Sequence, residues 1–133
     1  MLNLRHCHFF SVCDGHGHNG QEVSGLLKHR LPFQIEKHLK EGLAQHSMQQ
    51  YPDSLIIREN LTKAFAESNN EVFKMVSDVR FSGSTCTSMI TYGRRVYCAN
   101  VGDSRTILIR ASNTPDGKSS LSILCQSVNI HVG

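Results

Sequence analysis

The sequence contains no tryptophan, only three prolines, and no apolar run near the roughly 18 residues that suggest a membrane-spanning helix. The net charge of +3 is too small to indicate a nucleic-acid-binding surface. The first residues also lack the charged, apolar and small-residue regions of a secretory signal. With 39% hydrophobic and 19% charged residues, the composition is typical of one globular domain. We therefore expect a monomer that binds neither membrane nor nucleic acid.

The cysteines are odd in number and lie mostly in apolar, strand-like segments. They are Cys7, Cys13, Cys86, Cys98 and Cys125. This arrangement favours buried free thiols in a reducing compartment over a framework of disulfide bonds. The sequence therefore predicts an intracellular location, in the cytoplasm or the nucleus.

Histidines and cysteines are frequent in the first 18 positions, and a structural zinc-binding domain is one interpretation of them. The possible ligands are His6, Cys7, His8, Cys13, His16 and His18. Their spacing does not match the separated ligand pairs of zinc fingers. On a strand, alternation would also direct His6 and His8 away from Cys7. Surface histidines beside a buried strand are the preferred interpretation, with zinc binding as the alternative.

The stretch from Phe9 to Gly20, FFSVCDGHGHNG, combines a short apolar run with a turn that carries chemistry. The apolar part predicts a buried strand, and DGHG predicts the turn that ends it. Glycine permits a sharp turn and a close approach of a backbone carbonyl to an ion. Asp14 is a hard oxygen ligand suited to Mg²⁺ or Mn²⁺. Asp14 and His16 at a strand end therefore indicate metal-assisted hydrolysis, although an Asp-Gly pair can also be a plain turn.

Two helical segments follow, each with apolar residues at helical spacing. The first is predicted over residues 19–42, with Asn19 as the N-cap and a kink or break at Pro32. The second is predicted over residues 54–77. Its predicted buried face consists of Ile57, Leu61, Ala64, Phe65, Ser68, Val72, Met75 and Val76. The hydroxyl of Ser68 needs a hydrogen-bond partner on this face.

From Ser84 the apolar period changes to two, which predicts strands. They are expected over residues 84–92, 95–101, 105–110 and 121–125, with the last two separated by a turn at 115–117. We expect an α+β fold. An antiparallel β-meander over residues 84–109 would lie beside the strand at 9–13, with the two helices antiparallel and packed on one face.

Three short motifs occur in order along the chain: DGHG at 14–17, SGST at 82–85 and ANVGDSR at 99–105. Together they resemble the PP2C (PPM-type) metal-dependent protein serine/threonine phosphatases. The resemblance implies a partial PP2C-like α-β-β-α sandwich. The whole chain, 1–133, would be a single partial domain, with a family-like part over 9–110 and a divergent tail over 111–133.

The resemblance also implies roles for individual residues. Asp14 would bridge two Mg²⁺ or Mn²⁺ ions, the Gly15 carbonyl would bind one of them, and Asp103 would help to hold a further ion. Water activated by the metal would attack the phosphorus of phosphoserine or phosphothreonine in a phosphoprotein substrate. His16 would protonate the leaving oxygen. Asp103 can alternatively be a structural aspartate in a turn, and Ser84 and Thr85 are expected only as strand and turn residues.

Other acidic residues of the family's metal site have no counterpart in the sequence. The first acidic residue is Asp14, and the only acidic side chain after Arg110 is that of Asp116. The family's upstream acidic pair and its two downstream aspartates are therefore missing, as if the chain were a portion of a family domain. We expect little or no phosphatase activity from this chain alone. The alternative function is a catalytically inactive, truncated phosphatase-like protein that acts as a binding or regulatory module.

Overall fold

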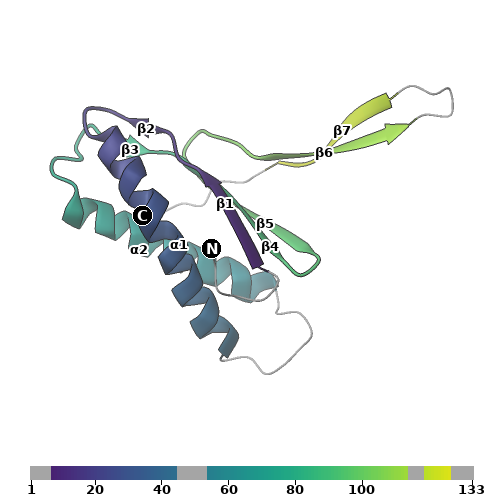
Figure 1. Cartoon of the computed structure of the whole chain (residues 1–133), viewed down its shortest axis with the longest axis horizontal. Helices are drawn as coiled ribbons and strands as arrows, with labels where there is room; N and C mark the ends of the chain where they lie inside the picture. Colours follow the sequence, from purple (N-terminus) through teal and green to yellow (C-terminus); the bar gives the residue numbers. More distant parts are fainter. Residues whose placement is uncertain (1–6, 45–53, 114–118, 127–133) are drawn as a thin grey trace.

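The computed structural model describes residues 7–44, 54–113 and 119–126. Within these ranges the elements, in chain order, are β1 (Cys7–Val12), β2 (Gly15–His16), α1 (Gly20–Ala44), α2 (Ser54–Met75), β3 (Gly83–Ser84), β4 (Cys86–Tyr92), β5 (Arg95–Val101), β6 (Ile107–Asn113) and β7 (Ser119–Gln126) (Figure 1). Neither α1 nor α2 is long and apolar enough to cross a lipid bilayer, and these are the helices of the described ranges.

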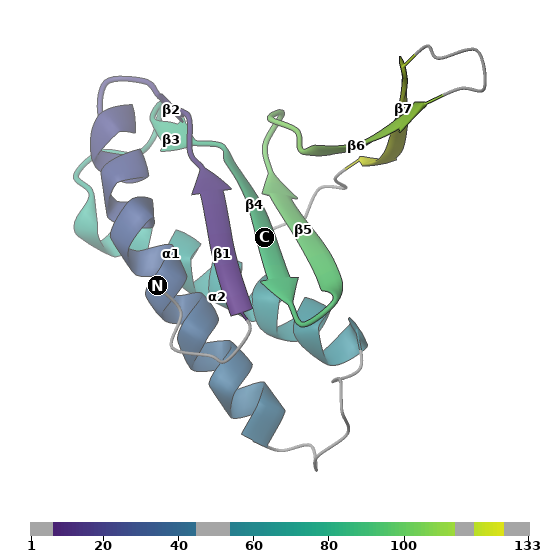
Figure 2. The same ribbon diagram turned by 45° about the vertical axis from the view of Figure 1, so that its right-hand side comes forward.

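The main sheet contains three antiparallel strands in the order β1-β4-β5. Both helices lie on one side of it, as Figure 2 shows. The β4–β5 hairpin was predicted from its alternating apolar pattern, and its turn contains Gly93 at a φ of 58°, a value that glycine adopts without strain. Pairing of strands distant in sequence therefore brings the start of the described chain beside residues 86–92.

The predicted buried strand of the first motif is buried on one face only. β1 lies at an edge of the sheet. Phe9 packs against the core, whereas Phe10 and Val12 are 57% and 68% exposed. Alternate side chains of a strand point to opposite faces, and the helices cover one face of this sheet. An apolar run alone did not reveal that neither helix of the described ranges covers the second face of this strand.

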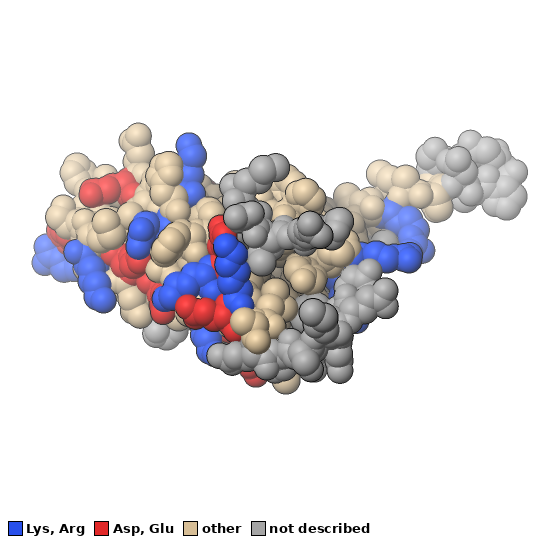
Figure 3. Space-filling model, turned by 60° about the horizontal axis from the view of Figure 1, so that its bottom comes forward, with Lys and Arg blue, Asp and Glu red and all other residues tan. Residues whose placement is uncertain are grey.

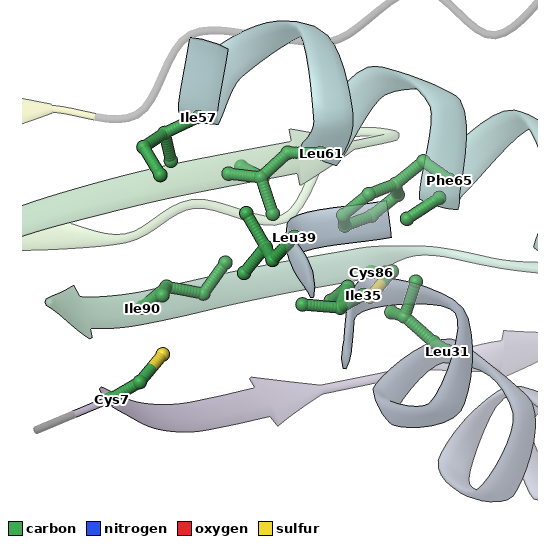
Figure 4. Packing of buried hydrophobic residues seen from close by; sticks show 11 residues of the cluster. Cys7, Leu31, Ile35, Leu39, Ile57, Leu61, Phe65, Cys86 and Ile90 are labelled. Carbon is green, nitrogen blue, oxygen red and sulfur yellow. The ribbon is translucent and has the colours of Figure 1, made fainter. Parts of the chain in front are cut away.

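One main cluster of buried side chains lies between the helices and the sheet (Figure 4). It comprises Leu31, Ile35 and Leu39 of α1, Ile57, Leu61, Ala64 and Phe65 of α2, and Cys7, Cys86, Ile90 and Ala99 of the sheet. Each large aliphatic side chain removed from water in this way stabilises the fold by about 1.5–3 kcal/mol. The fold is thus α+β, with its core where the predicted apolar helix faces meet the strands.

Helix α1 continues through Pro32, so the predicted break at this residue is wrong. Proline cannot donate the helical hydrogen bond to the Lys28 carbonyl. Lys28 is on the exposed side of the helix, where water can solvate that carbonyl. Leu31 and Ile35 on either side are buried in the core, and this packing maintains the helix across the proline. The helix also runs on past Gly42, where it was predicted to end.

Helix α2 has the predicted buried face with one exception. Met75 is 58% exposed, whereas Val72 and, directly after the helix, Val76 are buried. Ser68 is buried, and its hydroxyl donates a hydrogen bond of 2.8 Å to the Ala64 carbonyl. The predicted need for a partner is therefore met within the helix itself.

Arg30 interrupts the apolar face of α1, and a contact with α2 explains its position. Its Nε and Nη2 each donate to the Glu71 carboxylate at 2.7 Å, and Gln34 Nε2 donates to Glu71 Oε1 at 2.8 Å. The hydrogen bonds from Arg30 hold the pKa of the Glu71 carboxyl below its ordinary value. Figure 3 shows that acidic and basic side chains are interspersed on the face in view. The two helices are thus joined by polar contacts as well as by the core.

The predicted meander is divided in the structure. β6 does not continue the main sheet but pairs with β7 in a separate two-stranded sheet that projects from the body (Figure 1). Several of its apolar side chains are about half exposed or more: Ile107, Leu108, Ile109, Leu121 and Ile123. The predicted fourth strand is confirmed as β7. The predicted turn at 115–117 lies outside the described residues.

Candidate active site

The first two motifs are neighbours in space. Cys13 and Asp14 follow β1, and the chain then forms β2, which pairs in antiparallel fashion with β3. This pairing sets Gly15 opposite Ser84 and His16 opposite Gly83. DGHG and SGST therefore form one short ribbon at the end of the main sheet, in which Asp14, Gly15 and His16 are exposed.

Thr85 connects all three motifs. Its backbone N–H donates to the Asp14 carbonyl at 2.9 Å, and its hydroxyl oxygen accepts a bond of 3.3 Å from the Asp14 N–H. The same hydroxyl lies 2.7 Å from the Ser104 hydroxyl. Thr85 is 8% exposed, so water competes little for these bonds. The backbone position of Asp14 is thus fixed by a residue that also contacts the third motif.

Asp103 lies in the turn that follows β5. The preceding residue, Gly102, has a φ of 91°, a conformation that favours glycine, and its carbonyl accepts a bond of 3.1 Å from Asn100 Nδ2. A Cβ at Gly102 would lie 3.0 Å from the Thr85 side chain. Asp103 itself is exposed, next to Ser104. The structure thus brings the Asp14 and Asp103 turns to the same end of the sheet, joined through Thr85.

The glycine turn packs closely against the first residue of α1. A Cβ at Gly15 would lie 2.1 Å from the Gly20 carbonyl oxygen and 2.6 Å from its carbonyl carbon. The N–H of Gly20, in turn, donates to the Gly17 carbonyl at 3.1 Å. Only a residue without a side chain permits this contact at Gly15, so the sequence DGHG sets the distance between β2 and the start of α1.

Asn19 fixes the same turn from the other side. Its carbonyl accepts the first helical bond from Val23 N–H at 3.0 Å, as expected at an N-cap. Its side chain has a further role, because Nδ2 donates to the carbonyls of Ser77 and Asp78 at 2.6 and 3.1 Å. The Asn19 N–H also donates to Ser82 Oγ at 3.0 Å. Asn19 therefore ties the first motif to the segment that follows α2.

His16 lies over the second motif and beside a cavity of 210 Å³. A Cβ at Gly83 would lie 3.0 Å from His16 Nε2, which places the imidazole against the SGST backbone. The rest of the cavity wall is mainly apolar and includes Leu31, Phe65 and Val72. Neither Asp14 nor Asp103 lines this cavity. The carboxylates therefore lie on the exposed surface, outside the apolar wall.

Two thiols lie at the base of the Asp14 turn. The neighbouring Cys86 side chain lowers the pKa of the Cys13 thiol to about 7, although burial acts in the opposite direction. The Cys13 side chain and burial both raise the pKa of the Cys86 thiol. Both residues are free cysteines. The beginning of the candidate site therefore lies on two thiols, of which Cys86 is buried in the core and Cys13 packs against it.

The zinc interpretation gains no support from the geometry. Cys7 is buried and His8 is exposed, on opposite faces of β1, as alternation predicts. Across residues 7–44, 54–113 and 119–126, no group of three or more His, Cys, Asp or Glu side chains is placed to hold a metal ion. Asp14 and Asp103 do present exposed carboxylate oxygens, the donor type that Mg²⁺ and Mn²⁺ prefer. The described residues thus offer hard donors but only part of a coordination shell.

Comparison with known proteins decides the family. A sequence profile described as "Protein phosphatase 2C" matches residues 3–122. The chain belongs to the protein phosphatase 2C family. The matched range extends beyond the predicted family-like part, 9–110, at both ends.

Curated relatives within the PP2C family agree with this assignment. The chain is 37% identical to "Probable protein phosphatase 2C 72" of Arabidopsis thaliana over 107 residues, which covers 80% of this chain and 31% of the relative. It is 33% identical to "Probable protein phosphatase 2C 55" of Oryza sativa subsp. japonica over 104 residues, covering 77% and 24%. The chain thus spans about a third or less of the length of these relatives.

A solved PP2C structure shows the same fold. The serine-threonine phosphatase 2C of Toxoplasma gondii superimposes with a TM-score of 0.59 at 22% sequence identity. The superposition covers 94% of this chain and 41% of that protein. At this identity the likeness concerns the fold alone. It confirms a partial PP2C-like α+β architecture for the two helices and the antiparallel strands.

Thr85 and Ser104 belong to the PP2C-like motifs, but their positioning role was not predicted, since Thr85 was expected only as a strand or turn residue. The alternating pattern after Gly83 is equally consistent with an ordinary strand residue at Thr85. The hydroxyl contact between Thr85 and Ser104 depends on the pairing of β4 with β5, because this pairing brings the start of β4 beside the end of β5. The one feature of the sequence that could have indicated this role is the place of Thr85 at the start of a predicted strand, between two turn motifs.

Replacing Thr85 with valine tests the hydrogen bonds that its hydroxyl makes with the Asp14 N–H and the Ser104 hydroxyl. Thr85→Val keeps the branched shape but leaves the Asp14 N–H and the Ser104 hydroxyl without their partner, so we expect a loss of about 1–3 kcal/mol in the free energy of unfolding. Thr91→Val is the matched control, because Thr91 Oγ1 is buried and has no partner among the described residues. The control should be neutral or stabilising in urea denaturation. Equal losses in both variants would contradict a special role for the Thr85 hydroxyl.

Proposed function

We propose that this chain is a portion of a metal-dependent phosphatase that hydrolyses phosphoserine and phosphothreonine in proteins. The proposal rests on the hydrogen bonds of Thr85, which hold the backbone of Asp14 and the turn of Asp103 at one end of the sheet. Membership of the protein phosphatase 2C family supports the reaction type. The exposed position of this end leaves it open to a phosphorylated segment of another protein.

The metal ligands in this proposal are the Asp14 carboxylate, the Gly15 carbonyl and the Asp103 carboxylate, with Mg²⁺ or Mn²⁺ as the ions. All three are hard oxygen donors, and both carboxylates belong to exposed residues. A bound divalent cation supplies charge stabilisation at the phosphoryl group and lowers the pKa of water. The donors present in the described residues are too few to complete such a site, so the remaining ligands would come from outside them.

His16 has the catalytic role of a proton donor in this proposal. Its ring lies against the Gly83 backbone, and β2–β3 pairing fixes the strand that carries it. It can deliver a proton to the leaving oxygen of serine or threonine from a position two residues beyond Asp14. The proton and the carboxylate are then presented by one turn, whose backbone is hydrogen-bonded to Thr85 and paired with β3.

The first test is an assay of the purified 133-residue chain with Mn²⁺ and a phosphothreonine peptide. We expect little or no turnover, because each missing carboxylate weakens divalent binding by about an order of magnitude or more. Robust turnover that disappears in Asp14→Ala would show that fewer ligands suffice. Calorimetry that detects tight binding of Zn²⁺, lost in Cys7→Ser, would instead favour the zinc interpretation.

The second test places this chain in a complete phosphatase domain, which supplies the remaining metal ligands. Residues 7–113 of this chain would replace the matching segment of the Toxoplasma gondii phosphatase, whose fold guides the junctions. The chimera should be active, and His16→Ala should reduce kcat by about 100-fold or more. Asp14→Ala should abolish metal-dependent turnover. His18→Ala, an exposed histidine in the same turn, is the control and should retain activity. A folded chimera without activity would overturn the proposal.

A further inference from the structure

Two cysteines lie opposite each other at the base of the candidate site: Cys13 directly follows β1, and Cys86 is the first residue of β4. The register of β1 and β4 pairs Val12 with Thr87, so the next positions, Cys13 and Cys86, are opposite each other. Both side chains lie at the same core, in which Cys86 is buried and against which Cys13 packs. Both are free thiols in this structure. The proposed phosphatase chemistry makes no use of either.

The backbone around the pair suits a covalent bond. The Thr85 N–H donates to the Asp14 carbonyl at 2.9 Å, which makes residues 14 and 85 a hydrogen-bonded pair. The adjoining pair, Cys13 and Cys86, therefore occupies the non-hydrogen-bonded position, where opposite Cα atoms are about 4.5 Å apart and side chains approach most closely. This separation lies inside the range of roughly 4.4–6.8 Å that disulfides require. A bond can then form without a large backbone movement.

We propose that Cys13 and Cys86 form a reversible disulfide when the protein meets a peroxide. Cys13 is only half-buried and is the thiol that the oxidant reaches first, whereas Cys86 is 3% exposed. Peroxide converts the Cys13 thiol to a sulfenic acid and releases one water. The Cys86 sulfur then attacks the sulfenic sulfur, and a second water leaves as the S–S bond forms. The two thiols lose two hydrogens, and the peroxide is reduced to water.

The position of the bond connects it to the site. Cys13 directly precedes Asp14, and Cys86 directly follows Thr85. The disulfide would therefore link the two strand ends whose backbone bonds already position the Asp14 turn. Its effect on turnover rests on the proposed function, whereas its formation does not. The test therefore measures the bond itself.

The experiment treats the purified full chain with a modest excess of hydrogen peroxide. Remaining thiols are blocked with N-ethylmaleimide in denaturant, and unreduced peptides are mapped by mass spectrometry. We expect a linked peptide pair containing Cys13 and Cys86, lighter by two hydrogen atoms and separated again by dithiothreitol. Cys86→Ser should lose this species. Cys98→Ser, which removes an exposed thiol on β5, should keep it.

Two results would overturn the inference. One is oxidation of Cys13 to sulfinic acid while Cys86 remains a free thiol. The other is a set of bonds that pass mainly through Cys98 or between chains. If Cys86→Ser fails to fold by circular dichroism, the map of the unmodified sequence still decides. Because the readout needs neither metal nor substrate, failure here is distinguishable from failure of the phosphatase proposal.

Discussion

Gly15→Ala is expected to destabilise the protein by about 3 kcal/mol or more, the upper part of the range for overpacking where backbone cannot yield. A methyl group at this position would lie 2.1 Å from the Gly20 carbonyl oxygen and 2.6 Å from the carbonyl carbon. Both atoms are backbone at the first turn of α1, so no side chain can move aside. Either β2 must leave β3 or the start of α1 must shift. Urea denaturation followed by circular dichroism measures the loss.

Gly25→Ala is the matched control for this substitution. Gly25 lies on an exposed position of α1, and a Cβ there has nothing within 4 Å. Alanine is a better helix former than glycine, so this variant should gain about 0.5–1 kcal/mol. Opposite signs at the two glycines would identify the contact with Gly20 as the cause. A Gly15→Ala protein as stable as the parent would show that the turn has room to adjust.

Leu61→Ala is expected to cost about 2–5 kcal/mol, as large-to-small changes do in a packed core. Leu61 is 3% exposed and belongs to the cluster between the helices and the sheet (Figure 4). Because whole domains are stable by only about 5–15 kcal/mol, one such cavity removes a large share of the total. A fall in the midpoint of urea denaturation measures it.

Leu55→Ala provides the comparison within the same helix. Leu55 is 55% exposed, near the start of α2, and receives the same substitution. We expect a change within about 0.5 kcal/mol. Similar losses in the two variants would mean that helix propensity rather than core packing dominates. A difference of several kcal/mol would confirm that α2 is held mainly through its buried face.

Patterns local in sequence predicted local structure well. The strand pair on either side of Gly93 was recognised from alternation and a turn glycine, and its bounds are close to those of β4 and β5. The buried face of α2 followed from helical spacing, except at Met75. The helix break predicted at Pro32 was wrong because the lost hydrogen bond is a local effect that the sequence shows. The burial of Leu31 and Ile35, which outweighs this loss, depends on the whole fold.

The arrangement of the site depended on contacts between distant segments. The three motifs predicted that Asp14, His16 and Asp103 belong to one site. The hydrogen bonds of Thr85 that connect the motifs form only when β4 lies between β1 and β5. The place of β6 was not predictable for a similar reason. The sequence pattern predicted a strand over residues 105–110 without showing which strand it pairs with, and the structure pairs the observed strand, β6, with β7.

The pairing of β1 with β4 also sets the order in which the protein can fold during synthesis. β1 leaves the ribosome first, yet Val12 pairs with Thr87 and Cys7 with Tyr92, after both helices have been made. Closing such a long loop is entropically costly and slow. Until β4 emerges, the apolar sides of α1 and α2 lack the central strand of the sheet on which they pack. The nascent chain therefore passes through a long interval with an incomplete core, and chaperones that bind apolar segments are most relevant during that interval.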